Sequence, residues 1–195
     1  EFFDLPIKDK INSCIKIVCI GGMSNIKGIT DVVRVAKGCQ KHKLNFRIKI
    51  AGKILDSQLS YYEKVKKLIE SYNISEIKIL GEVRDIPNLI KEADVVLSMS
   101  YREASPTAVW EGLAAGKIVI STDVGSVCDH IINEKNGFVI QVGDISAAVN
   151  IIRRIDNDKF ELKKIKNSAR KTAIKNFSLK IISDKHIKIY KKVLN

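Results

Sequence analysis

Two glutamates eight positions apart, Glu103 and Glu111, stand out in the stretch REASPTAVWEGLAAG, residues 102 to 116. Pro106 has the fixed φ and the missing N–H group that suit the first position of a helix, which makes Ser105 the predicted N-cap. The free N–H groups at such a helix start would bind an anion. The spacing therefore predicts one carboxylate in the loop beside an anion site and a second carboxylate inside the helix.

The two carboxylates suit hydroxyl groups on either side of a bound anion. Glu103 would project over the crevice in which the anion binds, toward whatever is attached to that anion. Glu111 lies one helical turn beyond Thr107 on the same face of the helix. A carboxylate accepts hydrogen bonds from two hydroxyls at once, so Glu111 suits a diol such as ribose. Taken singly, either glutamate is more typical of an exposed surface position.

A second anion site is predicted in GGMSNIKGITD, residues 21 to 31. Gly21 and Gly22 allow a tight turn and a close approach of a ligand to the backbone, and Lys27 stands near the start of the next helix. The loop is neither a GxGxxG dinucleotide motif nor a P-loop, which argues against ordinary dehydrogenases and NTPases. Gly21, Gly22 and Gly28 are equally compatible with turn and packing roles. Two such anion sites facing one crevice could hold a diphosphate.

Alternating apolar runs and helical patterns must position these loops. The predicted strands are 15–20, 46–51, 76–80, 94–99, 117–121 and 137–142. The predicted helices are 28–41, 58–72, 86–92, 106–115, 126–134 and 145–155. This alternation predicts an α/β fold, a doubly wound, Rossmann-like parallel six-stranded sheet with helices on both faces. Ligands of such sheets bind beyond the carboxyl ends of the strands, where the winding reverses.

The positive charge is concentrated in the C-terminal part of the chain. The net charge is +12, and residues 159–195 contain twelve Lys and Arg against two acidic residues, so this part alone carries +10. Two helices, 159–175 and 179–193, are predicted there. Their lysines suit a solvated helix face, with an anionic membrane or an acidic partner domain as alternatives. Aromatic residues do not alternate with the lysines, which argues against nucleic acid as a partner.

Several other classes of protein are excluded by composition. No apolar run reaches the roughly 18 residues that span a bilayer, and no signal peptide is recognisable. The four cysteines and three histidines are scattered, so neither a metal site nor a disulfide framework is predicted. We expect a cytoplasmic protein. We expect residues 1–13 to be a linker from a missing N-terminal domain, 14–156 the Rossmann-like domain, and 157–195 basic helices that complete it.

Several motifs in one order resemble the carboxyl-terminal donor domain of retaining GT-B glycosyltransferases, the group 1 glycosyl transferase family. The E-x7-E spacing of Glu103 and Glu111 is followed by GLAAGKIVISTDVGS and NGFVIQVGD. KGITDVVRVAKG, ILGEVRDIPNLIKEADVVLSMSYREASP and the closing NFSLKIISDKHIKIYKKVL are similar to other parts of that domain. The resemblance runs from about Cys14 to the C-terminus.

The resemblance implies roles for individual residues. Lys27 matches the lysine that neutralises the donor diphosphate, Glu103 the glutamate that contacts the donor sugar, and Glu111 the glutamate that holds the ribose. The further positions that it places near the diphosphate or the base are the backbone of Ala104, Ser105 and Thr107 and the loop from Gly81 to Arg84. Gly22 departs from the family, which commonly has a second cation there, so either Arg84 or Arg102 substitutes or donor binding is weaker.

The resemblance implies transfer of a hexose from a nucleotide diphosphate, with UDP favoured, to an acceptor hydroxyl, as in polysaccharide or glycolipid synthesis. Configuration at the anomeric carbon is retained, and neither a metal nor another cofactor is required. The acceptor, a sugar or lipid-linked glycan, would bind the missing N-terminal domain, so we expect the fragment alone to be inactive. A peripheral contact with an anionic membrane at its inner face is a further expectation. The alternatives are a GT-B-type nucleotide-sugar epimerase and a non-catalytic nucleotide-binding or interaction module.

Overall fold

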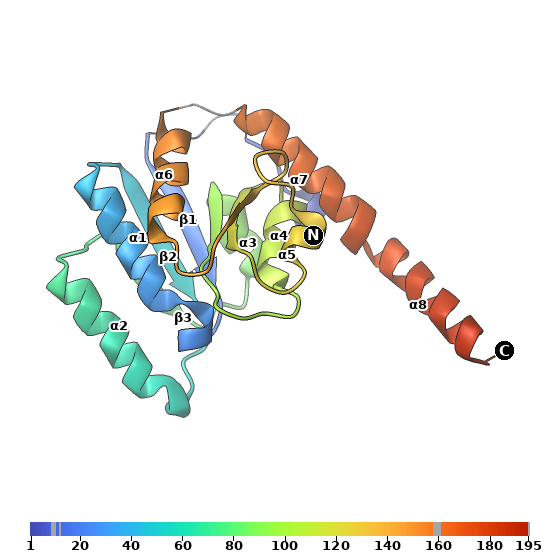
Figure 1. The fold of residues 1–195 in the computed structure, drawn as a ribbon, viewed down its shortest axis with the longest axis horizontal. Coiled ribbons are helices and arrows are strands. Elements are labelled where there is room, and N and C mark those ends of the chain that lie inside the picture. The colour runs from blue at the N-terminus through green and yellow to red at the C-terminus, as the bar shows by residue number, and fades with distance from the viewer. Residues whose placement is uncertain (9–10, 12, 158–160, 195) are drawn as a thin grey trace.

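Six parallel strands form one sheet in the computed structural model, which describes residues 1–8, 11, 13–157 and 161–194 (Figure 1). The strand order is β3-β2-β1-β4-β5-β6. The strands are β1 (Ile15–Ile20), β2 (Phe46–Ala51), β3 (Ile77–Gly81), β4 (Val95–Ser98), β5 (Ile118–Thr122) and β6 (Phe138–Ile140). The central strand β4 and its neighbour β5 are apolar and buried on both faces, as is typical of parallel sheets, whereas β3 at the edge is only partly buried. The predicted doubly wound sheet is therefore confirmed.

Helices cover both faces of this sheet. The face formed by Ile15, Ile17 and Cys19 of β1 shares a core with three helices, α1 (Ile29–Lys41), α2 (Leu59–Ser71) and α6 (Ile145–Asp156). Val18 of β1 points to the opposite face, where the covering helices are α3 (Ile86–Glu92), α4 (Thr107–Ala114), α5 (Val127–His130) and α7 (Leu162–Phe177). Short 3-10 helices complete the described elements, and they are η1 (Phe2–Asp4), η2 (Asn25–Lys27) and η3 (Asp56–Gln58).

The winding of the sheet reverses between β1 and β4. From β1 the chain moves outward through β2 to β3, and β4 then returns to the free side of β1, where Ile17 pairs with Val95. The loops that follow β1 and β4 therefore leave the sheet side by side at the carboxyl ends of two adjacent strands. Ligands of doubly wound sheets bind in the crevice at such a reversal.

The helix expected over 126–134 is shorter than predicted. α5 ends at His130, because the amide of Asn136 accepts from the backbone N–H of Ile132 and donates to the carbonyl of His130. Glu134 then adopts a φ of 62°, which no helix tolerates. The chain turns here and leads directly into β6.

The N-terminal segment packs on the body of the domain. Phe2, Phe3 and Leu5 contact the core beneath α4 and α7. Arg170 of α7 ties the segment down, since its guanidinium donates to the carbonyls of Leu5 and Ala114. Residues 9, 10 and 12 of the predicted linker lie outside the described residues, and its connection to a further domain stays a prediction.

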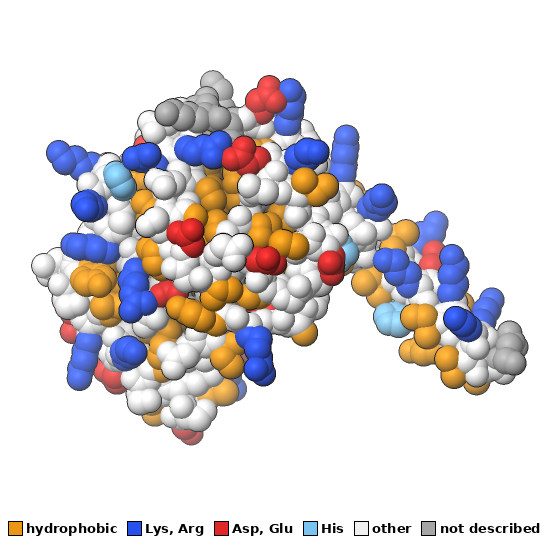
Figure 2. Space-filling model, in the orientation of Figure 1, with side chains coloured by type: hydrophobic (Ala, Val, Ile, Leu, Met, Phe, Trp, Pro, Cys, Tyr) orange, Lys and Arg blue, Asp and Glu red, His pale blue; other side chains and the backbone are white. Residues whose placement is uncertain are grey.

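The C-terminal helices match the prediction in number and place, although residues 158–160 at the expected start of the first lie outside the described residues. α7 packs on the sheet, whereas α8 (Leu179–Leu194) extends away from the body (Figure 1) and buries no residue. Apolar side chains follow one side of α8 and lysines the other (Figure 2). Among the described helices, none combines the length and the apolar character needed to cross a membrane.

Candidate functional site

The loops after β1 and β4 contact each other through their backbones. Gly28, the N-cap of α1, has a φ of 62°, and a Cβ at this position would lie 2.0 Å from the carbonyl oxygen of Met99. The N–H of Tyr101 donates to the carbonyl of Ile26 over 2.7 Å. Only glycine fits between the two loops at this point, so Gly28 sets how close they come.

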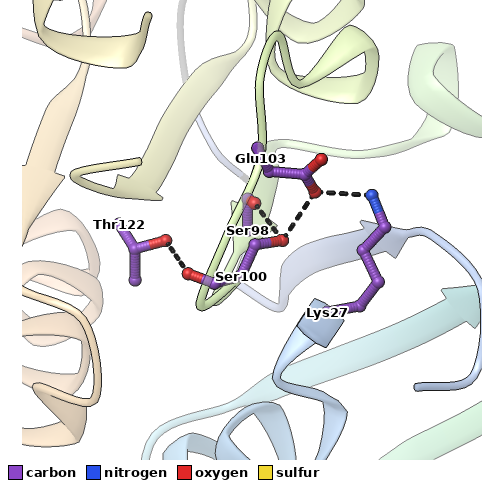
Figure 3. A network of polar contacts seen from close by, with 5 residues as sticks. All are labelled: Lys27, Ser98, Ser100, Glu103 and Thr122. Carbon is purple, nitrogen blue, oxygen red and sulfur yellow. Dashed lines mark hydrogen bonds and ion pairs between the residues drawn. The ribbon is translucent and has the colours of Figure 1, made fainter. Parts of the chain in front are cut away.

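This contact brings together Lys27 and Glu103, the charged residues that the sequence predicted for the two anion-binding loops. The Nζ of Lys27 lies 2.5 Å from Oε1 of Glu103, and the side chains are 33% and 15% exposed (Figure 3). The same oxygen accepts from the hydroxyl of Ser100 over 2.9 Å. The stem of Lys27 lies over Gly21, where a Cβ would approach it to 3.2 Å. An ammonium and a carboxylate therefore meet at the reversal of the sheet, partly shielded from water.

The start of α4 differs from the prediction by one residue. Pro106 is the N-cap, with an extended ψ of 96°, and Thr107 is the first helical residue. The prediction that Ser105 caps the helix is wrong, because its hydroxyl accepts a hydrogen bond from the indole of Trp110 instead, over 2.9 Å. Ala104, Ser105 and Thr107 are exposed, so the start of the helix remains open to a ligand.

Glu111 is half-buried in α4, one turn after Thr107. Burial removes water from its carboxylate and so raises the pKa of Glu111 above its ordinary value. No hydrogen bond or ion pair with another described residue compensates this carboxylate. A half-buried carboxylate without a protein partner is a candidate acceptor for hydroxyl groups of a ligand.

A third loop, which follows β5, supports the loop that carries Glu103. Gly125 has a φ of 55°, and a Cβ there would lie 2.3 Å from the carbonyl oxygen of Ala104. The N–H of Ser126 donates to the same carbonyl over 3.2 Å. At the end of β5, the hydroxyl of Thr122 donates to the carbonyl of Ser100 over 2.6 Å. Ser100 and Thr122 were not predicted as site residues, and their only signal in the sequence is a hydroxyl at the end of an apolar run.

The structure assigns no substitute for the missing second cation. A Cβ at Gly22 would meet only the side chain of Gln58 at 3.7 Å and the carbonyl of Lys53 at 4.0 Å, so sterics do not require glycine there. Arg84, in the loop after β3, and Arg102, beside Glu103, are both exposed. Within the described residues neither arginine forms an ion pair, which leaves both free to reach an anion. No group of His, Cys, Asp and Glu in the described part of the chain could hold a metal ion.

Known proteins resemble this chain in sequence and in fold. The model of the family "Glycosyl transferases group 1" matches residues 5–172. The chain is 26% identical over 129 residues to N,N'-diacetylbacillosaminyl-diphospho-undecaprenol alpha-1,3-N-acetylgalactosaminyltransferase of Campylobacter jejuni. The matched region covers 65% of this chain and 33% of that protein.

Two solved structures extend the similarity to almost the whole chain. A glycosyltransferase of Rickettsia africae is 29% identical, with a TM-score of 0.85 over 95% of this chain and 49% of that one. Alr3699/HepE of Anabaena, solved with UDP and glucose, is 20% identical and shares the fold, with a TM-score of 0.87 over 92% of this chain and 49% of that one. The chain thus spans half or less of the length of these relatives. It belongs to the group 1 glycosyl transferases.

Proposed function

We propose that this chain is the nucleotide-sugar-binding half of a retaining glycosyltransferase. The intact enzyme moves a hexose from a nucleotide diphosphate to an acceptor hydroxyl. The observation that carries the proposal is the contact between Lys27 and Glu103 at the reversal of the sheet. Membership of the group 1 family supports the same conclusion.

Lys27 and the helix starts serve the diphosphate in this proposal. The ammonium of Lys27, the N-terminus of α1 and the open backbone at Ala104, Ser105 and Thr107 supply positive potential where the leaving diphosphate gains charge. Such preorganised electrostatic stabilisation is usually the largest contribution to catalysis. Replacing Lys27 by Ala is then expected to lower kcat by about 10²- to 10³-fold.

The two glutamates serve the two sugars of the donor. Glu103 accepts from hydroxyls of the transferred sugar, and Glu111, whose carboxylate has no partner among the described residues, accepts from the ribose. Arg84 and the loop around it lie near the base and offer a cation to the phosphates. Lys27 and Glu103 compensate each other's charge, and on donor binding Lys27 can turn to the diphosphate while Glu103 accepts from the sugar.

UDP is the favoured nucleotide, and the acceptor is a sugar or a lipid-linked glycan bound by another domain of the intact enzyme. The complex of the Anabaena protein with UDP and glucose supports the first choice, and the diphospho-undecaprenol in the name of the Campylobacter relative supports the second. Transfer needs no metal, because Lys27 and the helix starts take over charge stabilisation. The enzyme acts in the cytoplasm, where nucleotide sugars are made.

Two alanine variants of the intact enzyme test this division of roles. Glu103→Ala is expected to abolish transfer while the affinity for UDP, measured by calorimetry, stays within about twofold. Glu111→Ala is expected to weaken UDP binding about tenfold, as loss of a charged hydrogen-bond partner does. Glu92→Ala is the matched control, because Glu92 is exposed and pairs with Lys49 away from the reversal. Equal losses of UDP affinity in both site variants would refute the assignment, and no binding of UDP, GDP or ADP would refute the function.

The exposed apolar side of α8 fits the missing half of the enzyme. Leu179, Val193 and Leu194 are 83%, 78% and 85% exposed, a costly arrangement for a lone helix in water. Since this chain spans about half or less of the length of the relatives described above, the rest of the protein is the proposed partner of this side. Val193→Glu should then lower the Tm of the intact enzyme, and Lys191→Glu, on the basic side, should not. Sedimentation of the intact enzyme only with anionic vesicles would instead assign α8 to a membrane.

A further inference from the structure

A chain of hydrogen bonds leads from β5 to the site carboxylate through Ser100 (Figure 3). The hydroxyl of Thr122 donates to the carbonyl of Ser100 over 2.6 Å, and the hydroxyl of Ser100 donates to Oε1 of Glu103 over 2.9 Å. Thr122 is fully buried and Ser100 is 3% exposed. The first bond is therefore buried and the second partly buried, in surroundings where hydrogen bonds are strengthened and a lost partner is costly.

The bonds to Glu103 use only one of its two carboxylate oxygens. Oε1 accepts from both Lys27 and Ser100, whereas within the described residues no donor reaches Oε2. Two donors from different loops fix both the position and the plane of the carboxylate. Oε2 is thereby left as the acceptor for a ligand hydroxyl.

We propose that Ser100 is a positioning residue that aims Oε2 of Glu103 at the transferred sugar, with Thr122 holding Ser100 in place. This inference rests on the proposed function of Glu103. In this proposal both residues act through the glutamate and not by binding the donor themselves.

Ser100 is better suited to this task than Lys27. Lys27 reaches Glu103 through a long, flexible stem, and its ammonium turns to the diphosphate when the donor binds. The Ser100 side chain has one heavy-atom torsion, is buried, and has only a weaker alternative partner, the hydroxyl of Ser98 at 3.4 Å. Its bond to Oε1 persists when Lys27 changes partner, so the carboxylate stays oriented during transfer.

Thr122 extends the support to the neighbouring strand. It is the last residue of β5, and its hydroxyl donates a hydrogen bond to the carbonyl of Ser100, which lies two residues beyond the end of β4. The backbone of Ser100 is thus tied to a strand rather than left to its loop. The direction of the Glu103 carboxylate then depends on a hydroxyl that lies outside the binding site.

The test compares how tightly the intact enzyme binds a nucleotide sugar and the bare nucleotide. UDP-glucose, UDP-N-acetylglucosamine and GDP-mannose are titrated by calorimetry beside UDP and GDP, and the donor with the highest affinity relative to its nucleotide is retained. Ser100→Ala is expected to lower this affinity ratio about tenfold while nucleotide affinity is unchanged. In the Glu103→Ala background the same change should have no effect, because the group it positions is gone.

Matched variants separate positioning from a general structural role. Ser121→Ala removes another fully buried hydroxyl, which donates to the carbonyl of Thr122 and to no other group of the described residues, and should leave the ratio unchanged. Thr122→Val should lower the ratio about threefold, and Thr122→Ser, which keeps the hydroxyl, should restore it. The Thr122 pair decides the question if Ser100→Ala does not fold.

Each remaining outcome has a defined meaning. An unchanged ratio in Ser100→Ala, with nucleotide binding intact, overturns the inference and leaves the proposed function standing. An equal loss of nucleotide and nucleotide-sugar affinity also overturns it, because that pattern marks a structural role. If the wild-type enzyme binds none of the nucleotides, the proposed function fails and the inference fails with it.

Discussion

Replacing Gly28 by alanine should uncouple the two loops that form the site. At a φ of 62° an alanine pays about 1 to 2 kcal/mol for the left-handed conformation, partly offset by a less flexible unfolded chain. The added Cβ would also lie 2.0 Å from the carbonyl oxygen of Met99, so the loops must separate by about 1 Å to reach a contact that real structures show. Such overpacking costs a further 1 to 3 kcal/mol, roughly, which gives a total of about 3 kcal/mol.

Gly81→Ala isolates the contact from the backbone strain. Gly81 has a similar φ of 69°, but a Cβ there meets nothing within 4 Å. The control should therefore lose about 1 kcal/mol, or about 3 °C in Tm, whereas Gly28→Ala should lose about 9 °C. Urea unfolding and thermal scans of the intact enzyme measure both variants, and UDP affinity should fall in Gly28→Ala because Lys27 precedes the strained position. Equal losses of stability in the two variants would refute the steric argument.

Three other changes test separate parts of the domain. Because burial raises the pKa of Glu111, its ionised form destabilises the fold at neutral pH; Glu111→Gln should raise Tm by about 1 to 3 °C at pH 7 in calorimetry, and an advantage that fails to shrink as pH falls toward about 4 would contradict this. Lys117 donates to the carbonyls of Lys91 and Ala93, so Lys117→Met should cost about 2 kcal/mol in urea unfolding at pH 7. Burial lowers the pKa of Lys117 to about 8, below its unfolded value, so the wild type should gain stability over that variant as pH rises from 8 to 10, and a constant difference would exclude the shift. Arg170→Ala should release the segment ahead of Pro6 to limited proteolysis, and an unchanged cleavage pattern would show that Phe2 and Phe3 alone hold it.

The sheet was predictable because each strand is a short apolar run between polar or glycine boundaries. All six predicted strands exist, and their ends differ from the prediction by one or two residues at most. The predicted helix 126–134 was too long because a tertiary contact ends the actual helix at His130. Its helical pattern continues past His130, but the side chain of Asn136 folds back onto the turn, and such a contact has no signature in local periodicity.

The candidate site was predictable in its charged residues and not in their supports. Lys27 and Glu103 follow strands that adjoin in a doubly wound sheet, so strand order alone brings their loops together. Ser100 and Thr122 meet because β4 and β5 pair with Ser98 opposite Ser121, and this register is not readable from either strand. The error at Ser105 has a similar origin, since the hydroxyl found a tryptophan side chain in place of a backbone N–H group.

The chain contains a single tryptophan, and its place beside the candidate site gives the domain a built-in optical sensor. The indole of Trp110 holds the hydroxyl of Ser105 and stacks on Phe177 at 4.6 Å between ring centres. Indole emission responds to changes in hydrogen bonding and in neighbouring rings. A ligand that rearranges the start of α4 will therefore change the emission of the one indole in this domain, without any added label.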